Sequence, residues 1–246
     1  MKVKNSLFLR DLRRAGRDVL VRALTSFLMA VFPALLFVCY YYKQDKNSSE
    51  PKGLVMTVFI LGIFSSFAVS LLENLVSQAS VIFQWSPFFY NFFEAFIVAG
   101  LCEEYIKLLI VINYVYRKPI FNEVMDGIVY TIVASLGFAC MENVLYVMGD
   151  TWHTAIARGF TAVPLHAVCS GMMGYYIGRA KFAATRQEEK FLIYKGLWQA
   201  VMIHGLYDFL LFISPVIGSV YSVAIVPLIF WTYLKLKKRI QIASQH

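Results

Sequence analysis

Long apolar stretches alternate with short polar breaks along this chain, and the pattern predicts the elements of the fold. A helix that crosses a bilayer needs about 20 mostly apolar residues. The stretches that are long enough predict seven spans, over residues 24–42, 54–72, 87–116, 124–148, 160–180, 192–213 and 216–234. Turn residues occupy the breaks, as in KQDKNSSEPKG before the second span and Ser214-Pro215 before the last.

The composition agrees with a protein that lies mostly in lipid. Of 246 residues, 59% are hydrophobic and 15% are charged, and the mean hydropathy is +0.61. Soluble domains of this length are far less apolar. We therefore predict an all-α, polytopic transmembrane bundle. Its single domain covers residues 24–236, between a basic N-terminal tail over 1–23, which could form an amphipathic helix, and a basic C-terminal tail over 237–246.

The net charge of +8 lies in the tails and loops. Because basic loops stay in the cytoplasm, we expect the first, third and fifth loops and the C-terminal tail on that side. With seven spans, the basic N-terminal tail would then lie outside. Either it is translocated against the rule, or the segment around Pro33 does not cross fully. The rule already accounts for the charge, so nothing indicates a nucleic-acid partner, and the lipid bilayer is the expected one.

Ionisable residues inside the spans are the strongest functional signal, because each costs about 2.5–3.5 kcal/mol at the centre of a membrane helix. The third span contains Glu103, Glu104 and Lys107 within GLCEEYIKLLIV. Helical spacing lets Lys107 pair with either glutamate. A structural ion pair would neutralise one carboxylate and leave the other free to act as a general acid or base. The spacing does not say which glutamate is the base.

The next three spans carry polar side chains as well. Glu142 and Asn143 lie in the fourth span, His166 in the fifth, and His204 and Asp208 in the sixth. Asn143 could form a structural hydrogen bond to a neighbouring helix. His204 and Asp208 are four residues apart and could simply form a hydrogen bond with each other. Since isolated polar groups in four consecutive spans would be costly, we predict that they converge on one hydrated pocket.

Small residues in the fifth span predict close helix packing. Gly174 and Gly178 are four residues apart and form a surface that lets a neighbouring helix approach. Asp126, at the start of the fourth span, could cap that helix.

Four motifs in order resemble the PrsW family of intramembrane proteases. They are E-E-x-x-K at Glu103, Glu104 and Lys107, F-x-x-x-E-N at Phe138, Glu142 and Asn143, His166 before a glycine-rich half-span, and H-x-x-x-D at His204 and Asp208. The first loop, with Asp45, Glu50 and Pro51, is also similar, and the likeness covers roughly residues 33–213. A more distant similarity links the chain to the CAAX-protease and bacteriocin-processing group.

The resemblance implies an integral protein of the bacterial plasma membrane that hydrolyses peptide bonds. PrsW-type members cut single-span anti-sigma factors on the extracytoplasmic side. Glu103 or Glu104 would deprotonate a water, while His204, oriented by Asp208, and Asn143 would stabilise the oxyanion or protonate the leaving amine. Alternatively, Zn²⁺ could be held by Glu142, His166 and His204. The chain has no H-E-x-x-H motif, so the metal is left open.

Two other classes of protein use similar residues. A proton- or cation-coupled transporter could use the buried carboxylates and imidazoles as a relay, although the chain shows no internal repeat of the kind many transporters have. A catalytically idle scaffold could bind membrane partners through its glycine face. The complete motif set favours the protease.

Overall fold

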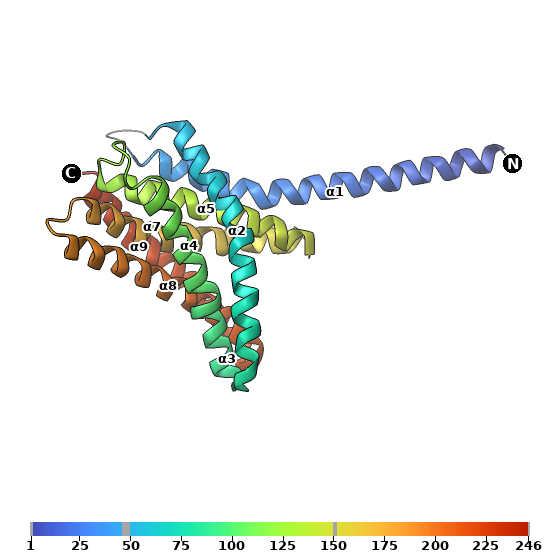
Figure 1. Ribbon diagram of the computed structural model, residues 1–246. Coiled ribbons are helices and arrows are strands. Elements are labelled where there is room, and N and C mark those ends of the chain that lie inside the picture. The colour runs from blue at the N-terminus through green and yellow to red at the C-terminus, as the bar shows by residue number, and fades with distance from the viewer. Residues whose placement is uncertain (1, 46–49, 150–151, 246) are drawn as a thin grey trace.

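The computed structural model describes residues 2–45, 50–149 and 152–245. All regular secondary structure in these ranges is helical, which confirms the predicted fold class (Figure 1). The α-helices are α1 (Lys2–Tyr42), α2 (Lys52–Ser80), α3 (Pro87–Phe93), α4 (Cys102–Tyr114), α5 (Val124–Gly149), α6 (Trp152–Phe160), α7 (Ala162–Lys181), α8 (Arg186–Ile217) and α9 (Ile225–Ala243). Between them lie the 3-10 helices η1 (Val81–Phe83) and η3 (Ser219–Ala224) and the π-helix η2 (Glu94–Leu101).

Within the described residues, four helical segments are long and apolar enough to cross a membrane. They are Ala23–Tyr42, Lys52–Ser80, Val124–Met148 and Arg186–Val216. These segments overlap the first, second, fourth and sixth predicted spans. The third and fifth predicted spans coincide with the composite segment α3–η2–α4 and with α7. The seventh, over 216–234, overlaps only the first half of α9, so the total of seven stays a prediction.

α5 is the central helix of the bundle. In its membrane-spanning window 89% of the residues are buried, against 11% in that of α1. α7 approaches it closely, because a Cβ atom on Gly127 would lie 2.4 Å from the carbonyl oxygen of Gly174, and one on Gly178 would lie 2.2 Å from that of Val124. The predicted small-residue surface on α7 is therefore confirmed.

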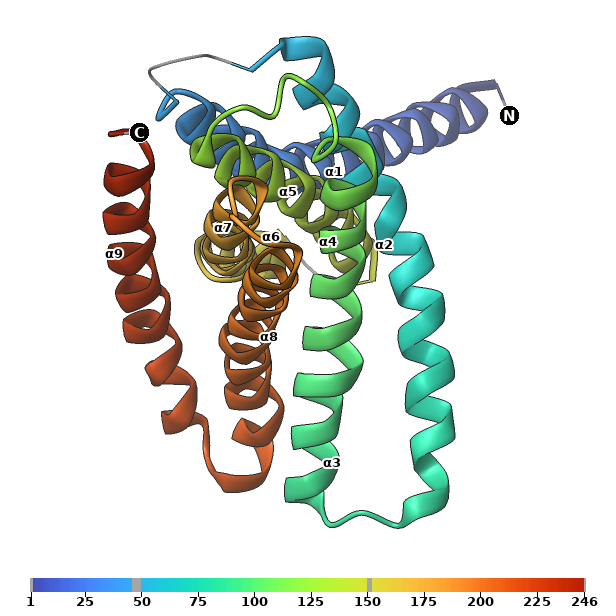
Figure 2. The same ribbon diagram turned by 60° about the vertical axis from the view of Figure 1, so that its left-hand side comes forward.

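The third predicted span is one column that changes helix type along its length. Figure 2 shows α3 and α4 in line, beside α2, with the two columns joined at one end through η1. The π-helical stretch η2 packs on α8, where Gly205 meets the ring of Phe96 and Gly100 meets the backbone of Val201. Because π-helical turns shift the register of the residues that follow, η2 helps to aim the start of α4 at α8.

Several helix ends differ from the predicted span ends. α9 begins at Ile225 and not at 216, because the end of α8 and η3 occupy the first part of the predicted span. α2 continues to Ser80, beyond the predicted end at 72, because the polar residues of its last turns lie along one face. α8 continues through Pro215 to Ile217 and ends at Gly218, whose φ of +114° favours glycine. The predicted boundary at Ser214-Pro215 is therefore a few residues early.

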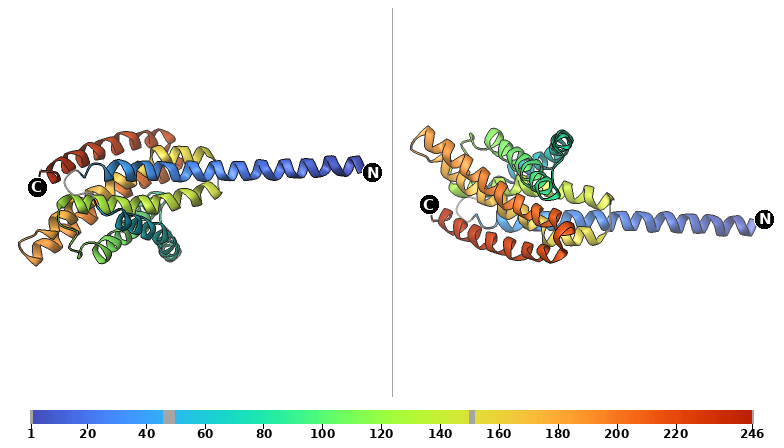
Figure 3. Two further views of the ribbon diagram at one scale, coloured as in Figure 1. Left: turned by 90° about the horizontal axis from the view of Figure 1, so that it is seen from above. Right: turned by 90° about the horizontal axis from the view of Figure 1, so that it is seen from below.

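α1 is a single helix that includes the predicted N-terminal tail. It continues through Pro33, and its first half projects away from the bundle (Figure 3). The free end of α1 lies far from the C-terminus and from the ends of α7 and α9 that carry the basic residues (Figure 1). The tension with the positive-inside rule therefore persists in the structure.

Candidate active site

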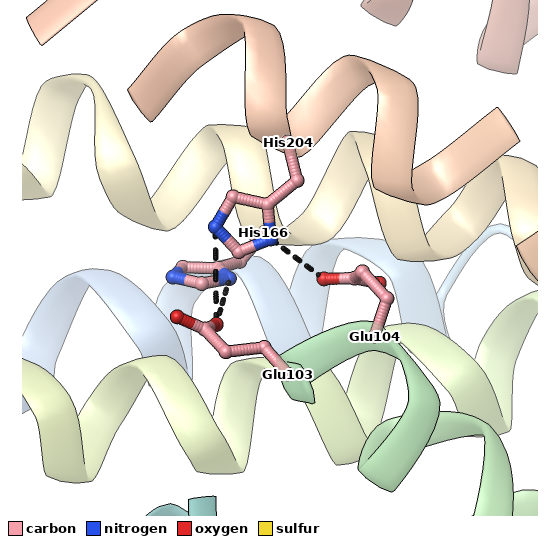
Figure 4. A group of neighbouring side chains, drawn as sticks. All are labelled: Glu103, Glu104, His166 and His204. Atoms are coloured by element: carbon pink, nitrogen blue, oxygen red, sulfur yellow. Dashed lines mark hydrogen bonds and ion pairs between the residues drawn. The ribbon is translucent and has the colours of Figure 1, made fainter. Parts of the chain in front are cut away.

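Two glutamates and two histidines from three helices form one compact group. Glu103 and Glu104 come from the first turn of α4, His166 from α7 and His204 from α8 (Figure 4). All four residues are buried, and one ligand atom from each lies within 4.8 Å of the others. The structure thus brings together side chains that are up to about a hundred residues apart in the chain. We call these four residues the central group.

Lys107 lies at the middle of the central group. Its ammonium is 2.9 Å from Glu103 Oε2, 2.8 Å from Glu104 Oε1 and 3.0 Å from His166 Nδ1, and the side chain is fully buried. Both carboxylates therefore share one cation, although the sequence suggested that only one of them would be paired. A lysine can only donate, so His166 Nδ1 accepts and the proton of this ring lies on Nε2.

His204 is held at both ring nitrogens by carboxylates. Nδ1 is 2.9 Å from Glu104 Oε1, and Nε2 is 3.2 Å from Asp208 Oδ2, one helical turn away on α8. Nε2 is also 3.8 Å from Glu103 Oε2. Two carboxylates, one at each ring nitrogen, fix the orientation of the ring.

The two adjacent glutamates have different surroundings. Glu104 is completely buried and also accepts a hydrogen bond of 2.7 Å from Ser170 Oγ. Glu103 keeps 7% of its side-chain surface and lines the cleft next to the group. Of the two, Glu103 is therefore the one in contact with the cleft, a distinction that helix spacing does not make.

Glu142 and Asn143 lie at the edge of the group. Glu142 Oε2 accepts from His166 Nε2 at 3.0 Å and forms an ion pair of 2.8 Å with Arg158. Asn143 is fully buried, with its oxygen 2.8 Å from Arg158 Nε and its amide nitrogen 3.4 Å from the carbonyl of Ala30. Asn143 therefore contacts Arg158 and α1 rather than the paired glutamates.

A cleft of about 390 Å³ opens beside the central group. Its inner end is formed by Glu103, His166, His204 and Asp208. The wall across from α8 comes from α2, whose side chains there are polar. They are Ser70, Glu73, Asn74, Ser77 and Gln78.

Arg158 and the polar wall of α2 belong to the site but were not predicted from the sequence. In the sequence, Arg158 is simply the one Lys or Arg residue between the fourth and fifth predicted spans. All of the α2 wall residues except Ser70 fell outside the predicted span, which ended at 72. Their spacing is i, i+3, i+4, i+7, the pattern of one helix face, and it would have identified them.

The central group has the donors and the convergence that suit a divalent cation. Two imidazoles and two carboxylates are the ligand types that zinc takes. The ammonium of Lys107 lies within 3.0 Å of Glu103, Glu104 and His166. The lone pairs of these three side chains therefore converge on one position that holds a positive charge. Glu142, part of the ligand set predicted from sequence, lies outside the central group and faces Arg158.

A second buried group, which we call the acidic group, consists of Asp45, Glu50 and Asp126. Asp126 Oδ2 accepts the backbone N–H groups of Asn122 and Glu123 at 2.6 and 2.8 Å, so it caps the start of α5 as predicted. The hydroxyl of Tyr130 donates to Glu50. Burial and then the neighbouring Asp126 carboxyl raise the pKa of Glu50 to about 8.

The chain matches a family model and several known proteins over most of its length. The family model, described as PrsW family intramembrane metalloprotease, matches residues 50–232. A "Protease PrsW" from Geobacillus kaustophilus is 34% identical over 181 residues, which is 74% of this chain and 77% of that protein. Proteins of the same name from Clostridioides difficile and Bacillus subtilis are 32% and 33% identical, over 76% and 74% of this chain and 79% and 80% of their own. No solved structure matches the chain.

Proposed function

The chain belongs to the PrsW family of intramembrane metalloproteases, and we propose that its substrate is a single-span membrane protein. The central group would be the active site, with Glu103 as the general base. As a member of this family it is a protease that acts on membrane proteins within a bilayer. The observation that carries the proposal is the contact of Glu103 with the cleft, beside His204.

Cleavage is expected toward the extracytoplasmic side. The basic ends of α7 and α9 and the basic starts of α2 and α8 lie at one end of the bundle, which the positive-inside rule assigns to the cytoplasm. The cleft is lined by the last turns of α2 and of α8, which point to the other end. A substrate bond held there would lie in the outer half of the membrane.

Glu103 is the better candidate for the general base. It can take a proton from a water in the cleft, while the Lys107 ammonium stabilises its charge before the transfer. Glu104 has no access to the cleft lining and is engaged by Lys107, Ser170 and His204. Its role would be to hold Lys107 and His204 in place.

His204 would protonate the leaving amine or stabilise the oxyanion. Its Nε2 faces Asp208 and Glu103 at the inner end of the cleft, so it can pass a proton there while Asp208 keeps the ring oriented. Asn143 would act through Arg158, which it holds against Glu142, because its amide is already bonded at both ends.

A metal ion fits this site as well. Bound by His166, His204 and Glu104, zinc would supply Lewis acidity, which polarises a carbonyl and makes water more acidic. The family description as a metalloprotease supports a metal, and the donor set supports zinc.

The substrate class that the resemblance implies is a single-span anti-sigma factor. A single-span helix has no partner helices that resist its unwinding, which suits a cleft of this size. The transporter alternative is not favoured, since the relatives of this chain are proteases.

Two measurements test the proposal. Mass spectrometry of membranes from cells with and without the intact chain should reveal a single-span protein truncated only when the chain is present. With that protein as substrate, Glu103→Gln should lower the purified enzyme's rate by about 10³-fold, within the usual range for general base catalysis. Glu188→Gln is the matched control, because Glu188 is exposed in the first turn of α8, about 24 Å along this helix from His204. Wild-type rates in Glu103→Gln would refute the role of Glu103.

A further inference from the structure

The second half of α2 has a polar face within an apolar membrane helix. Ser70, Glu73, Asn74 and Ser77 follow the spacing of one helix face, and all four line the cleft. The same cleft is lined from the other side by His204 and other residues of α8. The polar face therefore borders the space that leads to the central group.

The polar groups on α2 differ in how they are satisfied. Ser66 donates to the carbonyl of Ile63 in its own helix at 2.8 Å, and Ser77 donates to Glu94 Oε1 at 2.7 Å. Within the described part of the chain, the hydroxyl of Ser70 and the carboxylate of Glu73 have no hydrogen bond or ion pair with any residue. Since a carboxylate inside a membrane helix is costly, its retention beside a cleft indicates a polar occupant.

Peptide-bond cleavage in a membrane helix requires polar groups that bind the unwound backbone of the substrate. A peptide bond within a helix is shielded, so the substrate must unwind around the bond that is cut. Each backbone N–H or C=O released inside hydrocarbon is strongly unfavourable unless it forms a new hydrogen bond. Ser70 can donate to a carbonyl oxygen, and Glu73 can accept from an N–H.

The dimensions of the face suit an extended peptide. From Ser70 to Ser77 the helix rises about 10 Å. An extended strand rises about 3.3 Å per residue, so this length matches about three residues. We propose that Ser70, Glu73, Asn74 and Ser77 form a subsite for the unwound segment of the substrate, in which Ser70 donates to a backbone carbonyl and Glu73 accepts from a backbone N–H. This inference rests on the proposed function.

Kinetics on the full-length enzyme test the subsite, with the single-span protein identified above as substrate. Ser70→Ala should raise KM about three- to tenfold and Glu73→Ala at least about tenfold, with kcat changed less than about twofold, because a lost hydrogen bond weakens binding by this order. Glu73→Gln should lie between wild type and Glu73→Ala, since an amide oxygen still accepts. The matched control is Ser66→Ala, one helical turn from Ser70, whose hydroxyl bonds to its own helix.

Cross-linking gives a readout that does not depend on turnover. In a Glu103→Gln background and with an added thiol oxidant, Ser70→Cys should form a disulfide with a cysteine placed within two residues of the scissile bond. The linked peptides are identified by mass spectrometry. Leu75→Cys, on the exposed side of the same helix, should not.

The outcomes separate this inference from the assignment of the site. If Ser70→Ala and Glu73→Ala have the same KM as Ser66→Ala, the subsite is overturned. If Glu103→Gln is inactive in the same assays, the proposed function still stands. A fall in kcat at unchanged KM would also overturn it, because Glu73 would then serve the chemistry and not binding. Absence of cleavage by the wild-type enzyme would instead contradict the proposed function.

Discussion

The central group and the acidic group both bury several carboxylates, yet they hold the charge in different ways. In the central group, the carboxylates lie against the ammonium of Lys107 and against two imidazoles. In the acidic group, Glu50 lies beside Asp126 and accepts from the hydroxyl of Tyr130, and its raised pKa keeps it protonated at neutral pH. One group is compensated by a cation, the other by a proton.

The comparison teaches that a count of buried acids does not identify an active site. Within each group, one ligand atom from every residue lies within 4.8 Å of the others. Only the central group, among the described residues, combines acids with imidazoles and borders the cleft of about 390 Å³. The acidic group joins the first loop to the start of α5, which is a structural task.

Removal of the cation from the central group is expected to have the largest effect. Lys107→Met leaves two buried carboxylates without their shared partner, and breaking a buried pair typically costs about 3–5 kcal/mol. Activity should be lost, and the melting temperature of the purified protein in detergent should fall strongly. Lys190→Met, at an exposed position, is the control. Equal melting temperatures for the two variants would show that the cation does not hold this group together.

The metal content distinguishes the two groups directly. Elemental analysis of protein purified without chelator should find about one zinc ion per chain, and His204→Ala should lower the content at least about tenfold, since it removes a ligand of the central group. Glu50→Gln should leave the content unchanged. If Glu50→Gln lowers the zinc content and His204→Ala does not, the metal lies in the acidic group. Full activity of metal-free protein would show that the enzyme does not use zinc.

The smallest expected effect is a pH dependence of stability at Glu50. Its pKa is about 8 in the folded chain, against an ordinary value of 4.5. Between these values the unfolded chain has released the proton that the folded chain still binds. The contribution of Glu50 to stability is therefore complete below about pH 4.5 and declines as the pH rises to about 8.

Glu50→Gln should flatten this part of the pH profile, because an amide cannot ionise. The variant should melt a few degrees above wild type at pH 8 and about equally at pH 5, in thermal scans in detergent. Glu188→Gln serves as the control for loss of an exposed carboxylate. Parallel profiles for wild type and Glu50→Gln would show that Glu50 is ionised in the folded chain.

Much of the site could be predicted because its contacts lie within one helical turn. The spacing of Lys107 from Glu103 and Glu104, and of His204 from Asp208, placed these side chains together, and the structure has them at 2.9, 2.8 and 3.2 Å. The end of α2 was placed too early because its last turns mix polar and apolar residues, so a hydropathy reading ended the span at 72.

The sequence by itself determined the helical class, the apolar segments and the motifs of the family, because hydropathy and helix spacing are local properties. Only the tertiary structure decided that Glu103 and not Glu104 borders the cleft, that Arg158 holds Glu142 and Asn143, and that α2 forms a wall of the cleft. These facts depend on how each helix is rotated and where it crosses its neighbours. Rotation and crossing follow from packing between residues far apart in the chain, such as Gly100 of η2 against α8, which no local pattern contains.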